Sequence, residues 1–478
     1  MTTHELTAPP DARATSPPGA WWPHVRAALR GAHYDYTDGP VGRSLWLLAI
    51  PMVLETLMES LFAVCDVFFV SRLGPDAVAT VGLTESMLTL LYALAMGLSI
   101  GATATVARRI GEKDPDGAAR AAVQAIALGV GVSLAIGVAG GLAAPALLPA
   151  MGATPAIVET GSTYTRIMLG GNATVVLIFL INAVFRGAGD AAIAMRVLWL
   201  ANALNITLAP CLVFGLGPFP ELGVTGAAVA TNLGRGTGVL YQLYALTRRG
   251  GRLAIEARHL GLDGAVMRGI WRLSSTGVFQ ILVSTTSWVF LVRILSAFGS
   301  AVVAGNTIGI RLIVFAMLPA WGLANAAATM VGQGLGAGKP DRAERAAWLA
   351  ARYNVLCLTA VSVVFIAAAH PIVAIFTTDM EVARHAVACL RTVSLGFILF
   401  GLGMTLSSAL NGAGDTWTPT WINIGCFWGV EIPLAYALAV PLGWGPLGVY
   451  AAITIAFVLH ALVSVMVFRR GGWKTRRV

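Results

Sequence analysis

The sequence predicts an all-α polytopic membrane protein with twelve transmembrane helices, arranged as two parallel-topology six-helix lobes around a central cleft. Of its 478 residues, 57% are hydrophobic and only 12% are charged. A water-soluble protein of this size needs more surface charge, so lipid must contact most of this surface. Apolar runs of 20 or more residues recur from Leu45 to Phe468. Each run is long enough to cross a hydrocarbon core of roughly 30 Å.

The apolar runs have the character of membrane helices rather than membrane strands. They carry internal glycine and proline, which transmembrane helices tolerate, and they lack the polar/apolar alternation of a membrane β-barrel. The expected spans are approximately 44–71, 78–107, 118–145, 159–186, 191–216, 223–247, 269–297, 303–333, 344–370, 384–410, 416–441 and 446–468.

Lysine and arginine are distributed unevenly between the two ends of these spans. With the N-terminus inside, 25 of the 32 basic residues fall in cytoplasmic segments, whereas only Arg72 and Arg384 fall with certainty in outer connections. Cytoplasmic loops of membrane proteins are enriched in basic residues. We therefore expect a multi-pass protein of the plasma (cytoplasmic) membrane with both termini in the cytoplasm. The basic C-terminal end then faces anionic lipid, and no nucleic-acid partner is expected.

The chain repeats itself at a constant offset of 225 residues. The segment Arg186-Gly187-Ala188-Gly189-Asp190 recurs as Asn411-Gly412-Ala413-Gly414-Asp415, and Trp46, Gly111 and Arg166 match Trp271, Gly336 and Arg391. Six helices are an even number, so both halves start on the same side of the membrane. They should be related by a pseudo-twofold axis along the membrane normal, with substrate held between them.

The repeat divides the chain into five segments. These are a disordered cytoplasmic tail (1–43, with a short surface helix around 21–30), an N-terminal lobe (44–247), a cytoplasmic linker (248–268), a C-terminal lobe (269–468) and a basic cytoplasmic tail (469–478). Two such lobes make a monomer adequate for transport. The five cysteines lie singly in apolar segments, which predicts neither a disulfide framework nor a metal site.

The first expected helix contains three carboxylates, Glu55, Glu59 and Asp66. At about 100° per residue they project at roughly 0°, 40° and 20°, so they form one narrow stripe. Ionised groups at bilayer depth are costly, so this stripe should face a lobe interior. Three like charges there cannot all stay ionised without cations, so protons and cationic substrates would compete for them. The alternative is that hydrogen bonds from neighbouring helices satisfy these groups and merely fix packing.

Other residues at bilayer depth are weaker candidates for the same site. Pro51 removes one backbone hydrogen bond, so the first helix should kink close to Glu55; this kink could be a switch or an ordinary packing device. Neutral oxygens and amides for a cation could come from Asn202, Asn205, Asn172 and Thr231, although hydrogen bonding between helices explains them equally well. In the C-terminal lobe the polar candidates are Gln280, Glu431, Arg311 and Asn306, and Glu431 with Arg311 is a hypothetical ion pair.

Several segments together resemble the multidrug and toxic compound extrusion (MATE) family of secondary transporters. They are Pro51 with the stretch 66–74 (DVFFVSRLG), Gly111 and Gly336, the RGAGD/NGAGD pair, the fifth-helix pattern from Asn202 to Pro210, and the stretch 226–231 (GAAVAT) in the sixth helix. The resemblance covers about residues 40–470. It implies export of organic cations or other amphipathic compounds, driven by inward flow of H⁺ or Na⁺.

The resemblance also implies roles for two residues of the N-terminal lobe. Asp66 matches the coupling carboxylate of the family, and Asn205 matches an asparagine that assists it. One branch of the family has an acidic residue four positions after that asparagine, where this chain has Ala209. Another branch has acidic residues in helices 7 and 10, where this chain offers only Gln280 and no carboxylate before Asp415. The coupling ion, H⁺ or Na⁺, is therefore left open, and no other cofactor is expected.

Other functions fit the sequence less well. A flippase for lipid-linked precursors or polysaccharides would need basic residues to meet pyrophosphate, whereas the expected N-lobe cavity is acidic and favours cations. A membrane-embedded enzyme such as a prenyl transferase would show Asp-rich diphosphate motifs or a histidine pair, and the chain has neither. A gated channel is less compatible with paired lobes.

Overall fold

The computed structural model describes residues 21–31, 34–248 and 251–476, except for the side chains of 21–24, 63, 64 and 67. Within these ranges every regular element is helical. The N-terminal part contains α1 (Trp21–Arg30), α2 (Val41–Ser71), α3 (Pro75–Gly111), α4 (Pro115–Ala150), α5 (Pro155–Gly170), α6 (Ala173–Ala188), α7 (Ala191–Phe214) and α8 (Val224–Thr247). The C-terminal part contains α9 (Gly264–Ser296), α10 (Ser300–Gly336), α11 (Pro340–Ala367), α12 (Ala369–Ala374), α13 (Met380–Gly412), α14 (Trp417–Asn423), a π-helical segment (Ile424–Glu431), α15 (Ile432–Ala439) and α16 (Pro446–Arg469).

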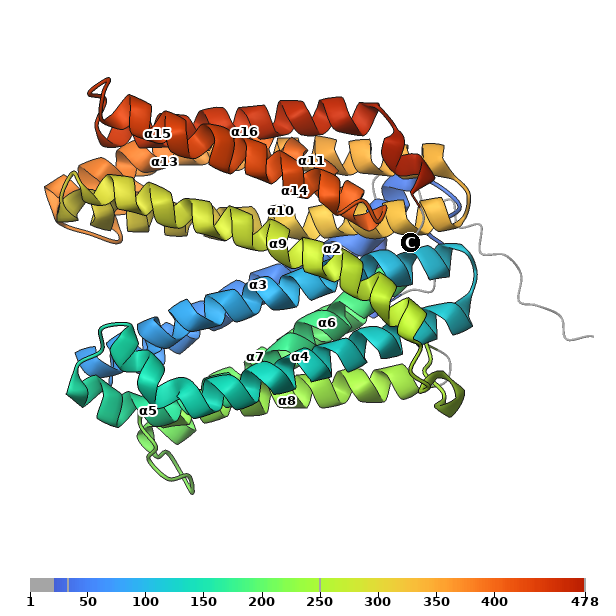
Figure 1. Cartoon of the computed structure of the whole chain (residues 1–478), viewed down its shortest axis with the longest axis horizontal. Coiled ribbons are helices and arrows are strands. Elements are labelled where there is room, and N and C mark those ends of the chain that lie inside the picture. Colours follow the sequence, from blue (N-terminus) through green and yellow to red (C-terminus); the bar gives the residue numbers. More distant parts are fainter. Residues whose placement is uncertain (1–20, 32–33, 249–250, 477–478) are drawn as a thin grey trace, which may run out of the picture.

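The predicted fold class is confirmed: the chain is an all-α membrane protein of two six-helix lobes. Eleven helical segments in the described ranges are long and apolar enough to cross a membrane, and α8 occupies the remaining place, packed against α6 and α7. Figure 1 shows the two bundles meeting where the chain ends and diverging toward the opposite end. We call the end where α2 begins and α16 stops the terminal end, and the other the far end.

Three expected spans are interrupted rather than continuous. The fourth is split between α5 and α6, the ninth between α11 and α12, and the eleventh contains the π-helical segment. At the first break, Gly170 and Gly171 are poor helix formers, and the Asn172 side chain donates hydrogen bonds to the Leu169 carbonyl (2.7 Å) and the Ser133 carbonyl (3.1 Å). The amide thus satisfies backbone oxygens that the break would otherwise expose inside the membrane.

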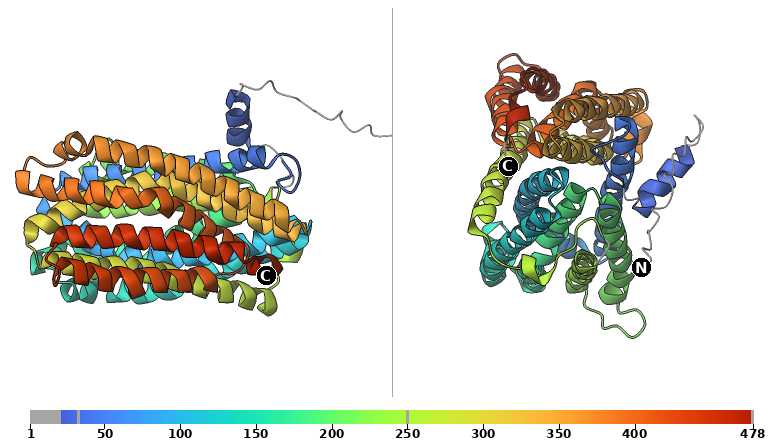
Figure 2. Two further views of the ribbon diagram at one scale, coloured as in Figure 1. Left: turned by 90° about the horizontal axis from the view of Figure 1, so that it is seen from above. Right: turned by 90° about the vertical axis from the view of Figure 1, so that its right-hand side faces the viewer.

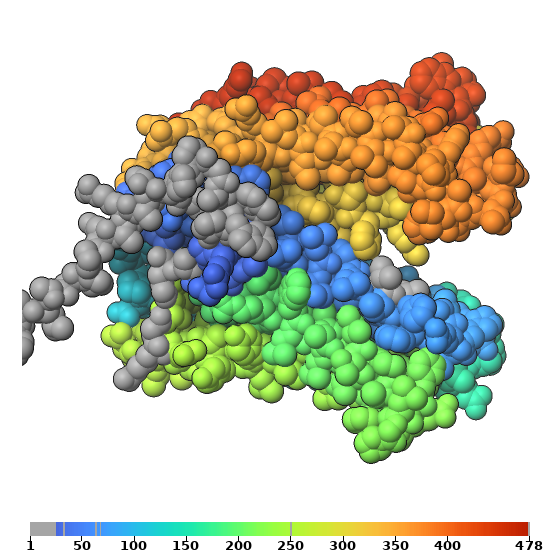
Figure 3. All heavy atoms as spheres, turned by 180° about the vertical axis from the view of Figure 1, so that it is seen from behind, coloured from blue at the N-terminus to red at the C-terminus, as the bar shows by residue number. Residues whose placement is uncertain are grey.

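The lobes touch along the half nearer the terminal end, where small residues let helix backbones approach. On α3, a Cβ added at Gly97 would lie 2.3 Å from the Val278 nitrogen on α9, and one at Gly111 would lie 2.1 Å from the Gln333 carbonyl on α10. Close backbone approach through small residues is how membrane helices associate. At the far end the lobes separate, and the space-filling view shows a hollow between them (Figure 3).

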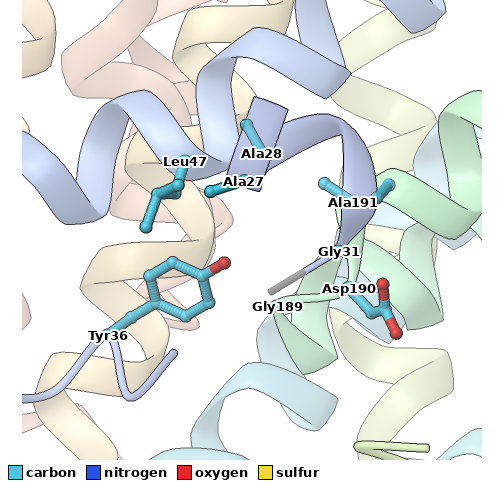
Figure 4. A pocket seen from close by; sticks show the side chains of 9 residues that line it. Ala27, Ala28, Gly31, Tyr36, Leu47, Gly189, Asp190 and Ala191 are labelled. Atoms are coloured by element: carbon cyan, nitrogen blue, oxygen red, sulfur yellow. The ribbon is translucent and has the colours of Figure 1, made fainter. Parts of the chain in front are cut away.

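Of the tail expected to be disordered over 1–43, the structure describes residues 21–31 and 34–43, and residues 1–20 lie outside the described part; the short helix expected around 21–30 is α1. The helix α1 contacts α2 and lies at the side of the bundle (Figure 2, right). Tyr36 is buried, and it lines a small pocket together with Leu47 and Gly189 (Figure 4). Arg252 of the linker donates to the Tyr34 carbonyl at 2.6 Å and stacks on the Tyr36 ring.

The same segment is also bound to the C-terminal lobe, so it bridges both lobes. On α11, Arg342 donates to the carbonyls of Tyr36 (2.9 Å), Asp38 (2.8 Å) and Gly39 (2.6 Å). Just before α11, Lys339 donates to the Thr37 carbonyl at 3.1 Å. These contacts tie the N-terminal segment across the joint at the terminal end.

The C-terminal tail is folded as well. Trp473 is buried and stacks on Phe468 with ring centroids 4.6 Å apart. Lys474 pairs with Glu344 at 2.5 Å, and this hydrogen bond raises the pKa of the lysine. Arg108 of the N-terminal lobe donates to the carbonyl of Arg476. The basic tail is therefore held partly by acidic residues of its own lobe, and it too reaches across the joint.

We expect Gly97→Ala to loosen the joint between the lobes, because its methyl group would meet the α9 backbone at Val278. Overpacking of this kind typically costs about 1–3 kcal/mol. The readout is thiol labelling of a cysteine introduced at Ser274, a buried position on α9, followed by peptide mass spectrometry. Labelling should rise in the Gly97→Ala background and stay at its basal level with Gly82→Ala, where an added Cβ meets nothing within 4 Å. Equal labelling in both backgrounds would contradict the packing argument.

Candidate functional site in the N-terminal lobe

The three carboxylates of α2 face the interior of the N-terminal lobe. Glu55 and Asp66 are 4% and 8% exposed, and the Glu59 side chain is 25% exposed. Residues on the other face of α2, such as Leu61 and Phe68, are about half exposed, as lipid-facing residues should be. The stripe predicted from helical spacing thus has the orientation that the sequence analysis expects.

Glu55 is bound by two residues of α6. Its Oε1 accepts a hydrogen bond from Arg186 Nη1 at 2.5 Å and another from Asn182 Nδ2 at 3.0 Å. Gln242 of α8 donates in turn to Asn182 Oδ1 at 2.7 Å. Arg186 is the first residue of the RGAGD segment, which the sequence identified only as a repeated motif. It supplies the positive charge that compensates Glu55.

Glu59 is bound by an arginine that the sequence analysis overlooked. Arg235, at the middle of α8, donates from Nη2 to Glu59 Oε1 at 3.0 Å and from Nη1 to the Tyr92 hydroxyl at 3.0 Å. Its side chain is only 2% exposed, and its guanidinium also lies over the rings of Phe62 and Tyr92. The signal was available, because a lone arginine inside an apolar span needs a partner at bilayer depth.

Asp66 has no ion pair in the structure, and its Oδ1 is buried with no hydrogen-bond partner. The charged groups that act on it electrostatically are Glu85 of α3 and Arg235. Asp66 also acts on the buried Tyr164 of α5. Asp66 is therefore the one carboxylate of the α2 stripe without a bound counter-charge.

Asn205 and Thr231 lie on α7 and α8, which pack together, and α7 packs on α2. Asn205 Nδ2 donates to Thr231 Oγ1 at 3.0 Å, and Asn205 Oδ1 is buried without a partner. Phe69, which follows Asp66 by three residues, belongs to one apolar cluster with Ala209 and Ala230 of these helices. The same group of helices thus holds an unsatisfied carboxylate oxygen and an unsatisfied amide oxygen. Ala209 is fully buried and leaves no second acid there.

Asn202 and Asn172 are bound to backbone rather than to the carboxylates. Asn202 Nδ2 donates to the Met58 carbonyl of α2 at 3.1 Å, while Asn172 caps the break between α5 and α6. Pro51 lies within α2, which continues past it, and Gly322 of α10 packs against the next turn at Val53. The predicted kink and its role as a switch stay predictions.

The C-terminal lobe has neutral residues where α2 has carboxylates. At the repeat offset, Gln280, Ser284 and Leu291 correspond to Glu55, Glu59 and Asp66, while Asn411 and His460 correspond to Arg186 and Arg235. Asn423 donates to Ser284 Oγ at 3.0 Å and lies 3.2 Å from His460 Nε2. A neutral chain therefore links the counterparts of Glu59 and Arg235.

The hypothetical ion pair between Glu431 and Arg311 is absent. Glu431 is 1% exposed inside the lobe and has neither a hydrogen bond nor an ion pair, whereas Arg311 is exposed and acts electrostatically on Glu85 of the other lobe. Asn306 accepts a weak hydrogen bond from Cys389, and Gln280 Oε1 is buried without a partner. Among the described residues, no cluster of three or more His, Cys, Asp or Glu is arranged to hold a metal ion.

The MatE family model matches the chain twice, over residues 51–211 and 277–437, once in each lobe. The chain belongs to the MatE family. Members of this family are membrane transporters, not enzymes. The double match also corresponds to the internal repeat seen in the sequence.

Relatives and solved structures of this family cover nearly the whole chain. A probable multidrug resistance protein NorM of Thermotoga maritima is 26% identical over 92% of this chain and 94% of its own. An FAD transporter of Shewanella oneidensis is 25% identical over 83% and 88%. The outward-facing conformation of a multidrug resistance MATE transporter matches with a TM-score of 0.86 and 27% identity, over 92% of this chain and 98% of that one.

We expect the two buried glutamates to differ in what they contribute to stability. Glu55→Gln should lower stability by about 3 kcal/mol, because breaking a buried pair leaves the Arg186 charge uncompensated. Glu431→Gln removes a carboxyl group without a partner and should leave the melting temperature in detergent unchanged or higher. A larger loss in Glu431→Gln than in Glu55→Gln would show that this description of the two sites is wrong.

Proposed function

We propose that the protein is a secondary active efflux transporter that exports organic cations or amphipathic drugs in exchange for entering H⁺ or Na⁺. The observation that carries this proposal is Asp66, a buried carboxylate without a counter-charge, in a lobe that also holds the unsatisfied Asn205 Oδ1. The multidrug resistance proteins among the relatives agree with this substrate class.

The chemistry of antiport follows from the state of Asp66. An ionised carboxylate in a low-dielectric lobe is stable only with a cation or a proton. Cargo and coupling ion therefore compete for the same group, and each must leave before the other binds. A proton needs only the Asp66 oxygen, whereas Na⁺ also needs neutral oxygens, which Asn205 and Thr231 could supply.

The orientation follows from the distribution of charge. The terminal end carries most of the basic residues, so we place this end and both termini in the cytoplasm. The hollow at the far end then opens to the outside of the plasma membrane, which agrees with the outward-facing MATE structure that this chain resembles. Alternating access would close this hollow and open the joint at the terminal end. One chain contains both lobes, so a monomer suffices.

We expect Asp66→Asn to abolish extrusion of ethidium from cells lacking their own major efflux pumps, because asparagine cannot exchange one cation for another. The matched control is Asp76→Asn, which changes an exposed carboxylate in the first turn of α3. This variant should extrude dye at the wild-type rate. Both variants are compared at equal levels in the membrane.

The same assay distinguishes the coupling ions and the competing functions. Loss of wild-type extrusion with a proton uncoupler indicates H⁺, and loss only on removal of sodium indicates Na⁺. Dye extrusion by Asp66→Asn at the wild-type rate would refute Asp66 as the coupling residue. Failure of the wild-type protein to move any dye would refute multidrug export and favour a narrower substrate or a lipid-linked precursor.

A further inference from the structure

Arg235 lies between two carboxylates of the α2 stripe. On α2, Phe62 follows Glu59 by three residues and precedes Asp66 by four, and the Arg235 guanidinium lies 4.9 Å from the centroid of the Phe62 ring. Phe62 lies within about one helical turn of both carboxylates along α2, so the guanidinium lies beside the part of the helix that separates them. In the structure it bonds to Glu59 and acts on Asp66 only at a distance.

Two contacts hold Arg235 toward Glu59. Its Nη2 is 3.0 Å from Glu59 Oε1, and its Nη1 is 3.0 Å from the Tyr92 hydroxyl. Meanwhile Glu59 Oε2 and Asp66 Oδ1 are both buried without partners. A guanidinium has five N–H donors, so Arg235 could serve either carboxylate. The Arg235 charge could therefore lie at Glu59 or at Asp66, and in the structure it lies at Glu59.

We propose that Arg235 is a built-in competitor for the Asp66 site, and that Glu59 and Tyr92 position it so that Asp66 stays available. This inference rests on the proposed function, because it assumes that Asp66 binds the coupling ion and the cargo. Arg235 and Glu59 are positioning residues here, because neither needs to touch the cargo. If Arg235 moved to Asp66, it would replace the cation that drives the cycle.

Two hydrogen bonds explain why the pair with Glu59 is the resting state. Moving Arg235 to Asp66 would break its bonds to Glu59 and to the Tyr92 hydroxyl, and it would leave the Glu59 carboxylate without its counter-charge. If Glu59 is neutral, the electrostatic part of that penalty disappears, and Asp66 is the other carboxylate that acts on Arg235. The other titratable groups that face this region are Glu85 and Tyr92 on α3 and Tyr164 on α5.

The charges of the lobe also limit what the site can accept. Glu55 is compensated by Arg186 and Glu59 by Arg235, so of the three carboxylates only Asp66 lacks a counter-charge. Within the α2 stripe, Asp66 is therefore the place for one added positive charge, such as a proton, a monovalent metal ion or an organic monocation. Glu85 of α3 also acts on Asp66 and adds to the negative potential there.

The test compares Glu59→Gln, Glu59→Asp and the double variant Glu59→Gln/Arg235→Gln. In Glu59→Gln, Arg235 should bond to Asp66, and ethidium extrusion should fall by about tenfold or more, because a buried ion pair must break in each cycle. Glu59→Asp keeps the charge and should keep extrusion. The double variant removes the competitor and should regain most of the wild-type rate.

A second measurement reports on Asp66 directly, without transport. Carbodiimide modifies a protonated carboxyl group in an apolar site, and peptide mass spectrometry identifies the modified residue. Asp66 should be modified in the wild type, in Glu59→Asp and in the double variant, and protected in Glu59→Gln. A loss of packing in Glu59→Gln would instead increase the modification, so the sign separates the two explanations.

The outcomes are distinct. If Asp66→Asn abolishes extrusion but Glu59→Gln extrudes dye and is modified at Asp66 like the wild type, the competitor is refuted while the antiporter stands. A double variant no better than Glu59→Gln also refutes it. If the wild-type Asp66 is not modified and Asp66→Asn extrudes dye normally, both the proposed function and this inference fail together.

Discussion

The constraint on which the rest of this lobe depends is that each ionised group at bilayer depth needs a partner. Two carboxylates of α2 satisfy this constraint, because Glu55 is paired with Arg186 of α6 and Glu59 with Arg235 of α8. The third, Asp66, has no paired cation among the described residues. Two ion pairs fix three helices relative to one another, since removing either partner would strand a buried charge. Asp66 is thus held on a helix that two ion pairs fix in place, and a proton or a cation is still needed to neutralise it.

The joint between the lobes obeys a different constraint. In lipid, helices associate through close packing and not through the hydrophobic effect, so the joint uses glycines on α3 and α10 that admit a neighbouring backbone. Between α2 and α10 the joint also contains larger side chains, such as Met52, Leu323 and Met330. The bonds from Arg342 and Lys339 to the segment before α2, and from Arg108 to the C-terminal tail, add polar links across the joint. They favour the conformation seen here.

The length of the apolar runs and the internal repeat predicted the fold class, and helical periodicity predicted the direction of the α2 stripe, because that direction depends on spacing along one helix. The partners of the stripe depend on which helices pack against α2 and on their relative position along the membrane normal. A single sequence does not give this information. Arg186 was noted only as part of the repeated RGAGD segment, and Arg235 was passed over although it lies alone in an apolar span. The break at Asn172 escaped notice for a related reason, since its side chain satisfies carbonyls that are exposed only once the helix is interrupted.

The internal repeat shows that a lobe does not need these charges in order to fold. The C-terminal lobe has the same six-span arrangement, yet Gln280, Ser284 and Leu291 stand where α2 has its carboxylates. Its counterpart of Arg235 is His460, which reaches Ser284 through the neutral amide of Asn423. A neutral hydrogen-bonded chain therefore links the same two positions without a buried ion pair. Because packing alone can be achieved in this cheaper way, packing does not explain why the N-terminal lobe retains three carboxylates and two arginines. The proposed exchange of cations at Asp66 would explain it.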